Sequence, residues 1–199
     1  MKKTRYNGII GVKGTWLIEW AKMVRKYIKG DEKKKEEFNS YLTANDWEII
    51  NGMIIPSQVY AYDFFQRLGR AVFHIVAKEN LEATRAFGKL LMKNLLIVYK
   101  NLLVANDPIA SAKKLVEYHS FCFINVVSRT SVKEEGEKFI TILLTLTKED
   151  KKYVEAAEAF AYQLAGSFEE LIAQAGAENV QMIIEKTPEG NFQYNATWQ

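Results

Sequence analysis

The feature that most constrains the fold of this chain is a change of hydrophobic period near residue 120. Before it, apolar residues recur about every fourth position, as Trp16, Trp20 and Val24 do, which is typical of amphipathic helices. After it, one apolar row occupies every second position, at 140, 142, 144 and 146, and alternates with Thr141, Leu143 and Thr145, which is the two-residue period of a half-buried strand. The sequence therefore predicts a helical half followed by a half that forms a sheet.

The predicted elements are separated by residues that cap or stop them. Helices are expected at about 16–28, 31–42, 43–50, 56–76, 81–104 and 109–119. The second half is expected to form strands at 121–131 and 140–146 around a turn at 133–137, then a helix at 149–175, then strands at 180–184 and 192–198. No linker rich in Gly, Pro or Ser separates the halves. We therefore predict an α+β fold in one domain, residues 1–199. Its helical part (about 14–120) precedes a hairpin–helix–hairpin (about 121–199), whose antiparallel sheet packs against helices.

Charge and composition favour a soluble globular protein that does not bind nucleic acid. The formal net charge is only +3, with 48% hydrophobic and 26% charged residues. The basic run 33–35 is followed directly by Glu36 and Glu37, so it is interpreted as a solvated helix face rather than a phosphate-binding stripe.

Short apolar runs and a single cysteine suggest a reduced, cytoplasmic setting. Runs such as 95–99 fall far short of the ~20 residues that span a bilayer, so no membrane insertion is expected. Gly11, Lys13 and Gly14 interrupt any apolar core of a signal peptide. Cys122 is alone, which excludes an internal disulfide and a cysteine metal site.

Catalytic motifs are absent from the sequence. There is no nucleophile elbow, no phosphate-binding glycine loop and no paired-histidine zinc motif. His74 lies between Arg70 and Lys78 on the polar side of its helix and is interpreted as a surface residue. We expect that the protein is not an enzyme and has no metal site.

His119 is the more informative histidine because its neighbours in sequence are apolar. Leu115, Val116, Phe121 and Phe123 surround it at the end of a predicted helix. It is either a half-buried imidazole that bonds to backbone or an axial ligand in an apolar cleft, and we favour the structural role.

Aromatic residues at helical spacing belong first to the core, although some could line a ligand pocket. We expect such a pocket near Phe87, Leu91, His119 and Phe160. Trp16 and Trp20 near the start of the chain could form a self-association face, flanked by the charged helix at 31–37.

Several short stretches resemble the haem nitric-oxide-binding and vinyl-4-reductase-like ligand-binding superfamily, whose α+β fold is shared by Golgi transport-tethering subunits. They are GVKGTWLIEW (11–20), FGKLL (87–91), NDPIASAKKLVEYH (106–119), GSFEELIAQAGAENVQMIIE (166–185) and GNFQYNATW (190–198). Within that superfamily the chain looks most similar to a bacterial group of paralogous proteins that is abundant in myxobacteria.

The resemblance raises the question of whether this chain binds haem. In haem-bearing relatives an Ala-Phe-Gly helix precedes the proximal histidine, and 86–88 and His119 look like that arrangement. Those relatives hold the porphyrin propionates with a Tyr-x-Ser-x-Arg motif on a following strand. The matching region, 141–152, has no tyrosine, serine or arginine, and the adjacent Ser128 and Arg129 would point to opposite faces of a strand. Because burying propionate charge without that motif is costly, we predict no cofactor and regard haem as unlikely.

Three functional hypotheses remain open. The first is a non-catalytic cytoplasmic sensor that holds a small apolar ligand between helices and sheet and signals to a partner protein. The second is a homodimeric interaction module without ligand. The third is a haem-based gas sensor with His119 as the axial ligand.

Overall fold

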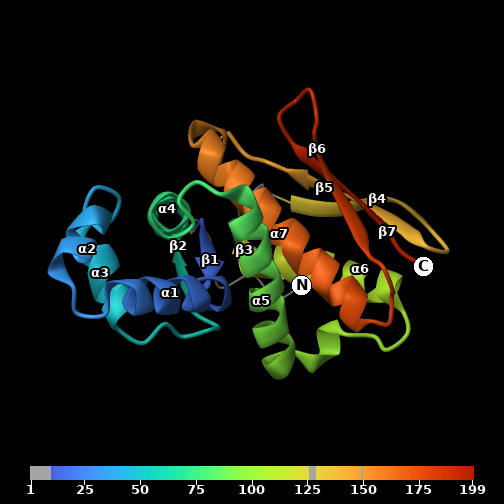
Figure 1. Cartoon of the computed structure of the whole chain (residues 1–199), viewed down its shortest axis with the longest axis horizontal. Helices are drawn as coiled ribbons and strands as arrows, with labels where there is room; N and C mark the ends of the chain where they lie inside the picture. The colour runs from blue at the N-terminus through green and yellow to red at the C-terminus, as the bar shows by residue number, and fades with distance from the viewer. Residues whose placement is uncertain (1–9, 126–128, 149) are drawn as a thin grey trace. The chain divides into compact units, whose positions relative to one another are not determined.

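The computed structural model describes residues 10–125, 129–148 and 150–199 (Figure 1); Ser128 and Glu149 lie outside them. Its contacts group the chain into two compact units. One comprises Met1–Glu79 with Phe121–Val126, and the other Asn80–Ser120 with Val127–Gln199. That both units belong to one domain stays a prediction.

The first unit is mainly helical but contains a small sheet. Its helices are α1 (Ile18–Ile28), α2 (Glu32–Phe38), α3 (Ala44–Asn51) and α4 (Tyr62–Ala71), and α4 continues into a π-helical turn at Val72–Val76. Its strands are β1 (Gly11–Lys13), β2 (Val59–Ala61) and β3 (Phe123–Ile124), which pair antiparallel in the order β2-β1-β3.

The second unit combines three helices with a four-stranded antiparallel sheet. The helices are α5 (Leu81–Val98), α6 (Pro108–Cys122, whose last two residues belong to the first unit) and α7 (Val154–Gln174), with short 3₁₀ turns at Lys100–Leu102 and Asp150–Lys152. The strands are β4 (Arg129–Gly136), β5 (Phe139–Thr145), β6 (Gln181–Lys186) and β7 (Phe192–Thr197), in the order β4-β5-β7-β6. These elements confirm the predicted α+β class.

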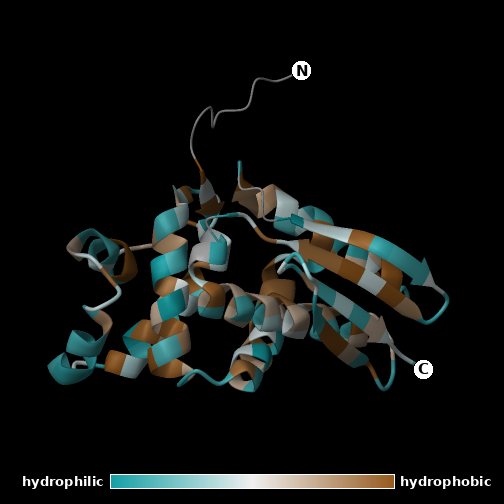
Figure 2. Ribbon diagram, turned by 90° about the horizontal axis from the view of Figure 1, so that it is seen from above, coloured by the Kyte–Doolittle hydropathy of each residue, from teal (hydrophilic) through white to brown (hydrophobic). Residues whose placement is uncertain are grey.

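Alternation along the central strands places one face of this sheet in the core. Ile140, Ile142 and Leu144 of β5 are fully buried, and so is Tyr194 of the neighbouring β7. Figure 2 colours the chain by hydropathy and shows apolar residues along the strands of this sheet. Helix α7 packs on β6 and β7, and α5 packs along α7 (Figure 1).

Two glycines allow α5 and α7 to approach closely. A Cβ added to Gly88 of α5 would lie 1.9 Å from the backbone oxygen of Gln163, and one added to Gly166 of α7 would lie 2.0 Å from that of Arg85. The hydroxyl of Ser167 donates to the carbonyl of Gly88 across this crossing at 3.1 Å. The backbones are therefore in direct contact, without side chains between them.

An ion-pair network joins the same two helices at their surface. Arg85 and Lys89 of α5 both contact the carboxylate of Glu169 on α7, at 2.9 and 2.6 Å. Arg85 also donates to the carbonyl of Met182 at 3.0 Å, which ties both helices to β6.

Several predicted elements differ from the structure. The strand expected at 121–131 is divided: α6 runs on to Cys122, β3 pairs with β1 in the other sheet, residues 126–128 are outside the described part, and β4 begins at Arg129. The expected turn at 133–137 is mostly strand, because β4 continues to Gly136 with a register shift that leaves Lys133 as an extra residue. Charged residues and bulges are common on edge strands, and they hide the two-residue period.

The predicted self-association face at Trp16 and Trp20 was wrong. The two side chains are only 2% and 4% exposed. Trp16 packs edge-on against Phe123, and Trp20 stacks on Phe65 with ring centroids 4.9 Å apart. Both indoles are core residues of the first unit.

Candidate functional site

His119 lies in the last turn of α6 and is completely buried. Its ring lies 6.1 Å from that of Phe160 on α7, at a tilt of 33°. This is the helix-to-strand position that the sequence predicted, since β3 begins four residues later. A buried imidazole next to an aromatic ring is the strongest candidate for a functional group in this unit.

Burial keeps this imidazole neutral. Desolvation lowers the pKa of His119 from 6.5 to about 3, because an apolar interior disfavours the charged form. At neutral pH the ring therefore retains a nitrogen lone pair, which is the form that coordinates metal ions.

The helix that carries His119 is held at several points within the second unit. Tyr118 packs against Tyr99 with ring centroids 5.2 Å apart. The hydroxyl of Thr130 on β4 donates to the carbonyl of Val116 at 3.4 Å, and Lys113 pairs with Glu135 on the same strand. These contacts position the end of α6 relative to the sheet.

The structure brings together two of the four predicted pocket residues. His119 and Phe160 are ring neighbours, and Phe160 is 8% exposed. Leu91 is buried on α5, whereas Phe87, one turn earlier on the same helix, is only half-buried. Whether all four share one ligand pocket stays a prediction.

Sequence reasoning missed the contribution of Gly166. From the sequence we named Phe87 as a pocket residue and 86–88 only as a stretch that resembles one in haem-bearing relatives. In the structure, Gly88 and Gly166 set the close crossing of α5 and α7, the helix that carries Phe160. The signal was present in the small residues of Ala165-Gly166-Ser167. Small residues on a helix face allow close backbone approach.

His74, expected at the surface, is half-buried in the first unit. Its ring stacks on Tyr41 at 5.3 Å, and its Nδ1 lies 2.9 Å from Glu79.

Among the residues that the structure describes, no group of three or more His, Cys, Asp or Glu side chains is arranged to hold a metal ion. No described helix has the length and apolar character needed to cross a bilayer.

Comparison by sequence gives no relatives. No protein-family model matches the chain, and no curated protein matches it.

Comparison with solved structures gives matches over nearly the whole chain. The ferrous, unliganded H-NOX protein from K. algicida matches with a TM-score of 0.66 and 13% identity, over 94% of this chain and 96% of that one. An H-NOX variant from T. tengcongensis matches with a TM-score of 0.61 and 16% identity, over 94% and 97% of the two chains. The chain has the H-NOX fold. The fold that the superfamily resemblance implied is therefore confirmed, whereas the likeness to a myxobacterial group stays a prediction.

The H-NOX likeness corrects the expectation that the chain takes no cofactor, which was wrong. A further match, at a TM-score of 0.62 and 16% identity over 94% and 95% of the chains, comes from work on haem distortion in the H-NOX family. The expectation rested on one missing propionate motif, and the neutral, buried histidine was given too little weight.

The described residues can supply an axial ligand for a haem iron. His119 offers a neutral imidazole in apolar surroundings, with Phe160 beside it. The propionate position departs from the relatives' motif, since 141–152 lacks its three residue types and Arg129 is exposed at the start of β4. The fit therefore rests on the iron ligand and not on the carboxylates of the porphyrin.

Proposed function

We propose that this chain is a non-catalytic, cytoplasmic sensor domain that binds haem, with His119 as the axial ligand of the iron. The observation that carries the proposal is the complete burial of His119, which holds its pKa near 3. The proteins of this fold described above support it. From the sequence we already expected a ligand-binding role, but with a small apolar ligand in place of haem.

Bound haem would supply an iron coordination position at which a small diatomic gas can bind. The protein's part is to hold the proximal nitrogen. His119 does this as a neutral donor whose helix is anchored to β4 through Val116 and Thr130, and Phe160 limits the rotation of its ring from one side.

The absence of the Tyr-x-Ser-x-Arg motif from 141–152 bears on whether the propionates of a bound haem are buried or exposed to solvent. Burying two carboxylates without hydrogen-bonding partners costs several kcal/mol. We therefore expect the propionates of a bound haem to reach solvent. Since His119 is completely buried, haem uptake has to open the packing around it and should be slow.

Titration of the purified protein with hemin, followed by visible absorption, tests the proposal. The expected result is a saturable Soret band with one haem per chain. In the His119→Ala variant the axial ligand is lost, so the band should shift and affinity should fall by tenfold or more. The matched control is His74→Ala, which removes the chain's other histidine and should leave the spectrum unchanged.

Two results would contradict the proposal. One is a protein that gives no saturable Soret band after prolonged incubation with hemin. The other is a His119→Ala variant that retains its fold by circular dichroism and binds hemin with the spectrum and affinity of the wild type.

A further inference from the structure

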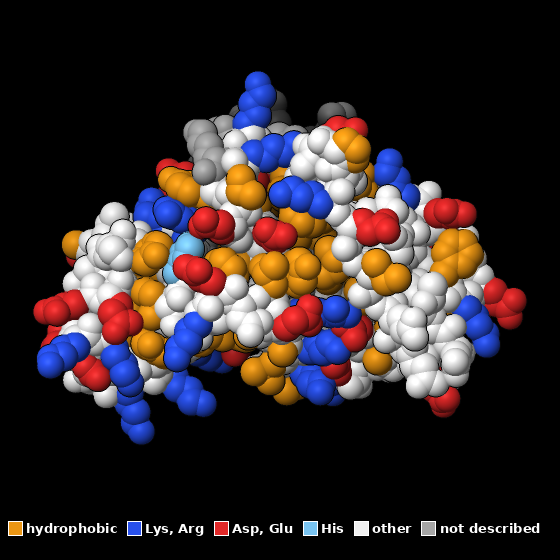
Figure 3. Space-filling view, turned by 45° about the horizontal axis from the view of Figure 1, so that its top comes forward, with side chains coloured by type: hydrophobic (Ala, Val, Ile, Leu, Met, Phe, Trp, Pro, Cys, Tyr) orange, Lys and Arg blue, Asp and Glu red, His pale blue; other side chains and the backbone are white. Residues whose placement is uncertain are grey.

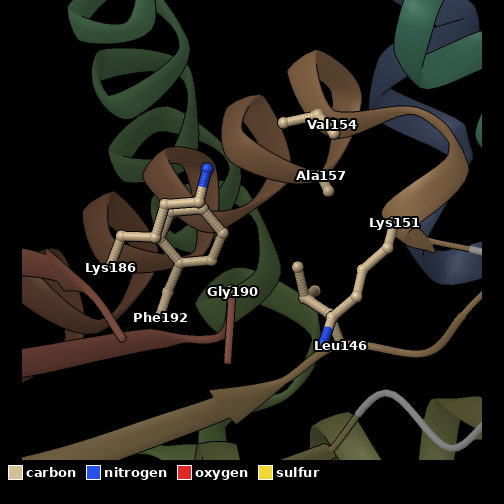
Figure 4. A pocket seen from close by; sticks show the side chains of 7 residues that line it. All are labelled: Leu146, Lys151, Val154, Ala157, Lys186, Gly190 and Phe192. Atoms are coloured by element: carbon tan, nitrogen blue, oxygen red, sulfur yellow. The ribbon is translucent and has the colours of Figure 1, made fainter. Parts of the chain in front are cut away.

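A cavity of about 210 Å³ lies in the second unit, at the start of α7. Its floor is apolar: Leu146, Ala157 and Phe192 line it, and their side chains are 7%, 8% and 2% exposed. Figure 4 shows these side chains converging from the end of β5, from α7 and from β7. None of the four predicted pocket residues lines it.

Two lysines flank this apolar floor. Lys151 and Lys186 both line the cavity and come from opposite sides of the group drawn in Figure 4. The ammonium of Lys151 donates to the backbone carbonyl of Glu189 at 2.6 Å, and that of Lys186 lies 5.9 Å from the centre of the Phe192 ring. Within the described parts of the chain, neither ammonium forms an ion pair.

One carboxylate lies close to this rim. The hydrogen bond from Thr187, whose hydroxyl donates to Glu189 Oε2 at 2.8 Å, is the largest cause that lowers the pKa of Glu189, and the charge of Lys151 adds a smaller contribution in the same direction. Glu189 is fully exposed and held by Thr187, so it offsets the charge of Lys151 only in part. The rim therefore keeps a net positive charge.

The mouth of the cavity is also apolar. Val154, which lines it, is 52% exposed, and its neighbour Tyr153 is 39% exposed. Exposed apolar side chains that adjoin an apolar cavity are typical of ligand-binding sites. At about 210 Å³ the cavity has the liquid volume of roughly seven waters, which limits its occupant to a small molecule.

We propose that this cavity binds a small amphiphilic carboxylate, with its apolar body on Leu146, Ala157 and Phe192 and its anionic head between Lys151 and Lys186. The apolar floor excludes a fully polar anion such as phosphate, because a hydrated ion gains nothing from an apolar wall. The two lysines favour an anion over a neutral or cationic amphiphile. The proposal is independent of haem binding.

Isothermal titration calorimetry of the full chain with octanoate tests it. The wild type should bind one octanoate, more tightly than the neutral analogue 1-octanol, and the affinity should fall as NaCl is added. Replacing both lysines, Lys151→Gln with Lys186→Gln, should weaken octanoate binding about fivefold, since each exposed charge pair contributes only modestly. The same double variant should leave 1-octanol binding unchanged.

The matched control removes two exposed lysines from the β4–β5 hairpin of the same unit. Lys133→Gln with Lys138→Gln makes the same change in net charge and should bind octanoate like the wild type. Ala157→Phe fills the cavity and should abolish binding while thermal unfolding shows that the fold is kept. His119→Ala should bind octanoate normally, which separates this site from the proposed haem site.

Several outcomes would overturn the proposal. They are a wild type that does not bind octanoate, a hairpin control that loses as much affinity as the cavity variant, and 1-octanol that binds as tightly as octanoate. A folded Ala157→Phe variant with wild-type affinity would place any binding elsewhere and would overturn it as well.

Discussion

The crossing of α5 and α7 gives the sharpest mutational prediction, because two effects of opposite sign compete in Gly88→Ala. Helix propensity favours alanine over glycine by up to ~1 kcal/mol. The new Cβ, however, would lie 1.9 Å from the Gln163 carbonyl oxygen, so the helices must separate by about 1.5 Å to restore an ordinary contact of 3.4 Å. Overpacking of this kind costs ~1–3 kcal/mol, and here the obstacle is backbone, which cannot rotate away.

The steric cost should therefore prevail, with a net loss of about 1–2 kcal/mol in the free energy of unfolding. For a chain of this length that lowers Tm by about 2–8 °C, which differential scanning calorimetry resolves. The propensity contribution is calibrated by Ala86→Gly, an exposed position on the same helix. A Gly88→Ala variant as stable as the wild type, or more stable, would refute the close crossing.

Gly166→Ala makes the same test from the other helix. Its Cβ would lie 2.0 Å from the Arg85 carbonyl oxygen. Because one separation of the helices relieves both clashes, the double variant should lose less stability than the two single variants together. Strict additivity would indicate two independent clashes and contradict this reasoning.

Two further predictions concern buried titratable groups. In the unfolded chain His119 is protonated below its ordinary pKa of 6.5, whereas in the folded chain it is protonated only below about pH 3. The free energy of unfolding of the wild type should therefore fall as the pH decreases from about 6.5 to about 3, by up to about 4–5 kcal/mol. Urea unfolding at several pH values checks this: the loss should shrink in His119→Gln and persist in His74→Gln, and equal slopes in all three proteins would contradict it. Arg67→Ala should cost about 3–5 kcal/mol, since Arg67 bonds the fully buried Asp46 at 2.7 and 2.8 Å; burial raises the pKa of Asp46, but Arg67 and Thr43 lower it overall. A loss below 1 kcal/mol in urea unfolding would show that this pair is not needed.

The second half of the fold was predictable because its elements are long enough to show a period. β5 alternates over seven residues and β7 over six, and α7 has an apolar face over 21 residues. The small sheet of the first unit was not predictable. Its strands have only two or three residues each, which is too few to distinguish a two-residue period from a helical one.

The candidate site was predictable only in part, for a similar reason. His119 stands out because its own sequence neighbours are apolar. The lysine-flanked cavity combines single residues from separate elements, such as Leu146, Ala157 and Phe192, and each has an ordinary sequence context. Such a constellation depends on tertiary structure and has no linear signal.

Surface charge agrees with the absence of a concentrated basic stripe in the sequence. On the face shown in Figure 3, Lys and Arg side chains are intermixed with Asp and Glu. Ion pairs such as Lys22–Glu19 and Lys35–Glu32 also place opposite charges next to each other in the first unit. That the chain does not bind nucleic acid stays a prediction.

Resonance Raman spectroscopy of the hemin-loaded, reduced protein tests the central claim most directly, because it reports the bond between iron and histidine. We predict an iron–histidine stretching band that shifts when histidine is labelled with ¹⁵N, disappears in His119→Ala and persists in His74→Ala. A spectrum without that band in the wild type, or one that His119→Ala leaves unchanged, would show that His119 is not the ligand.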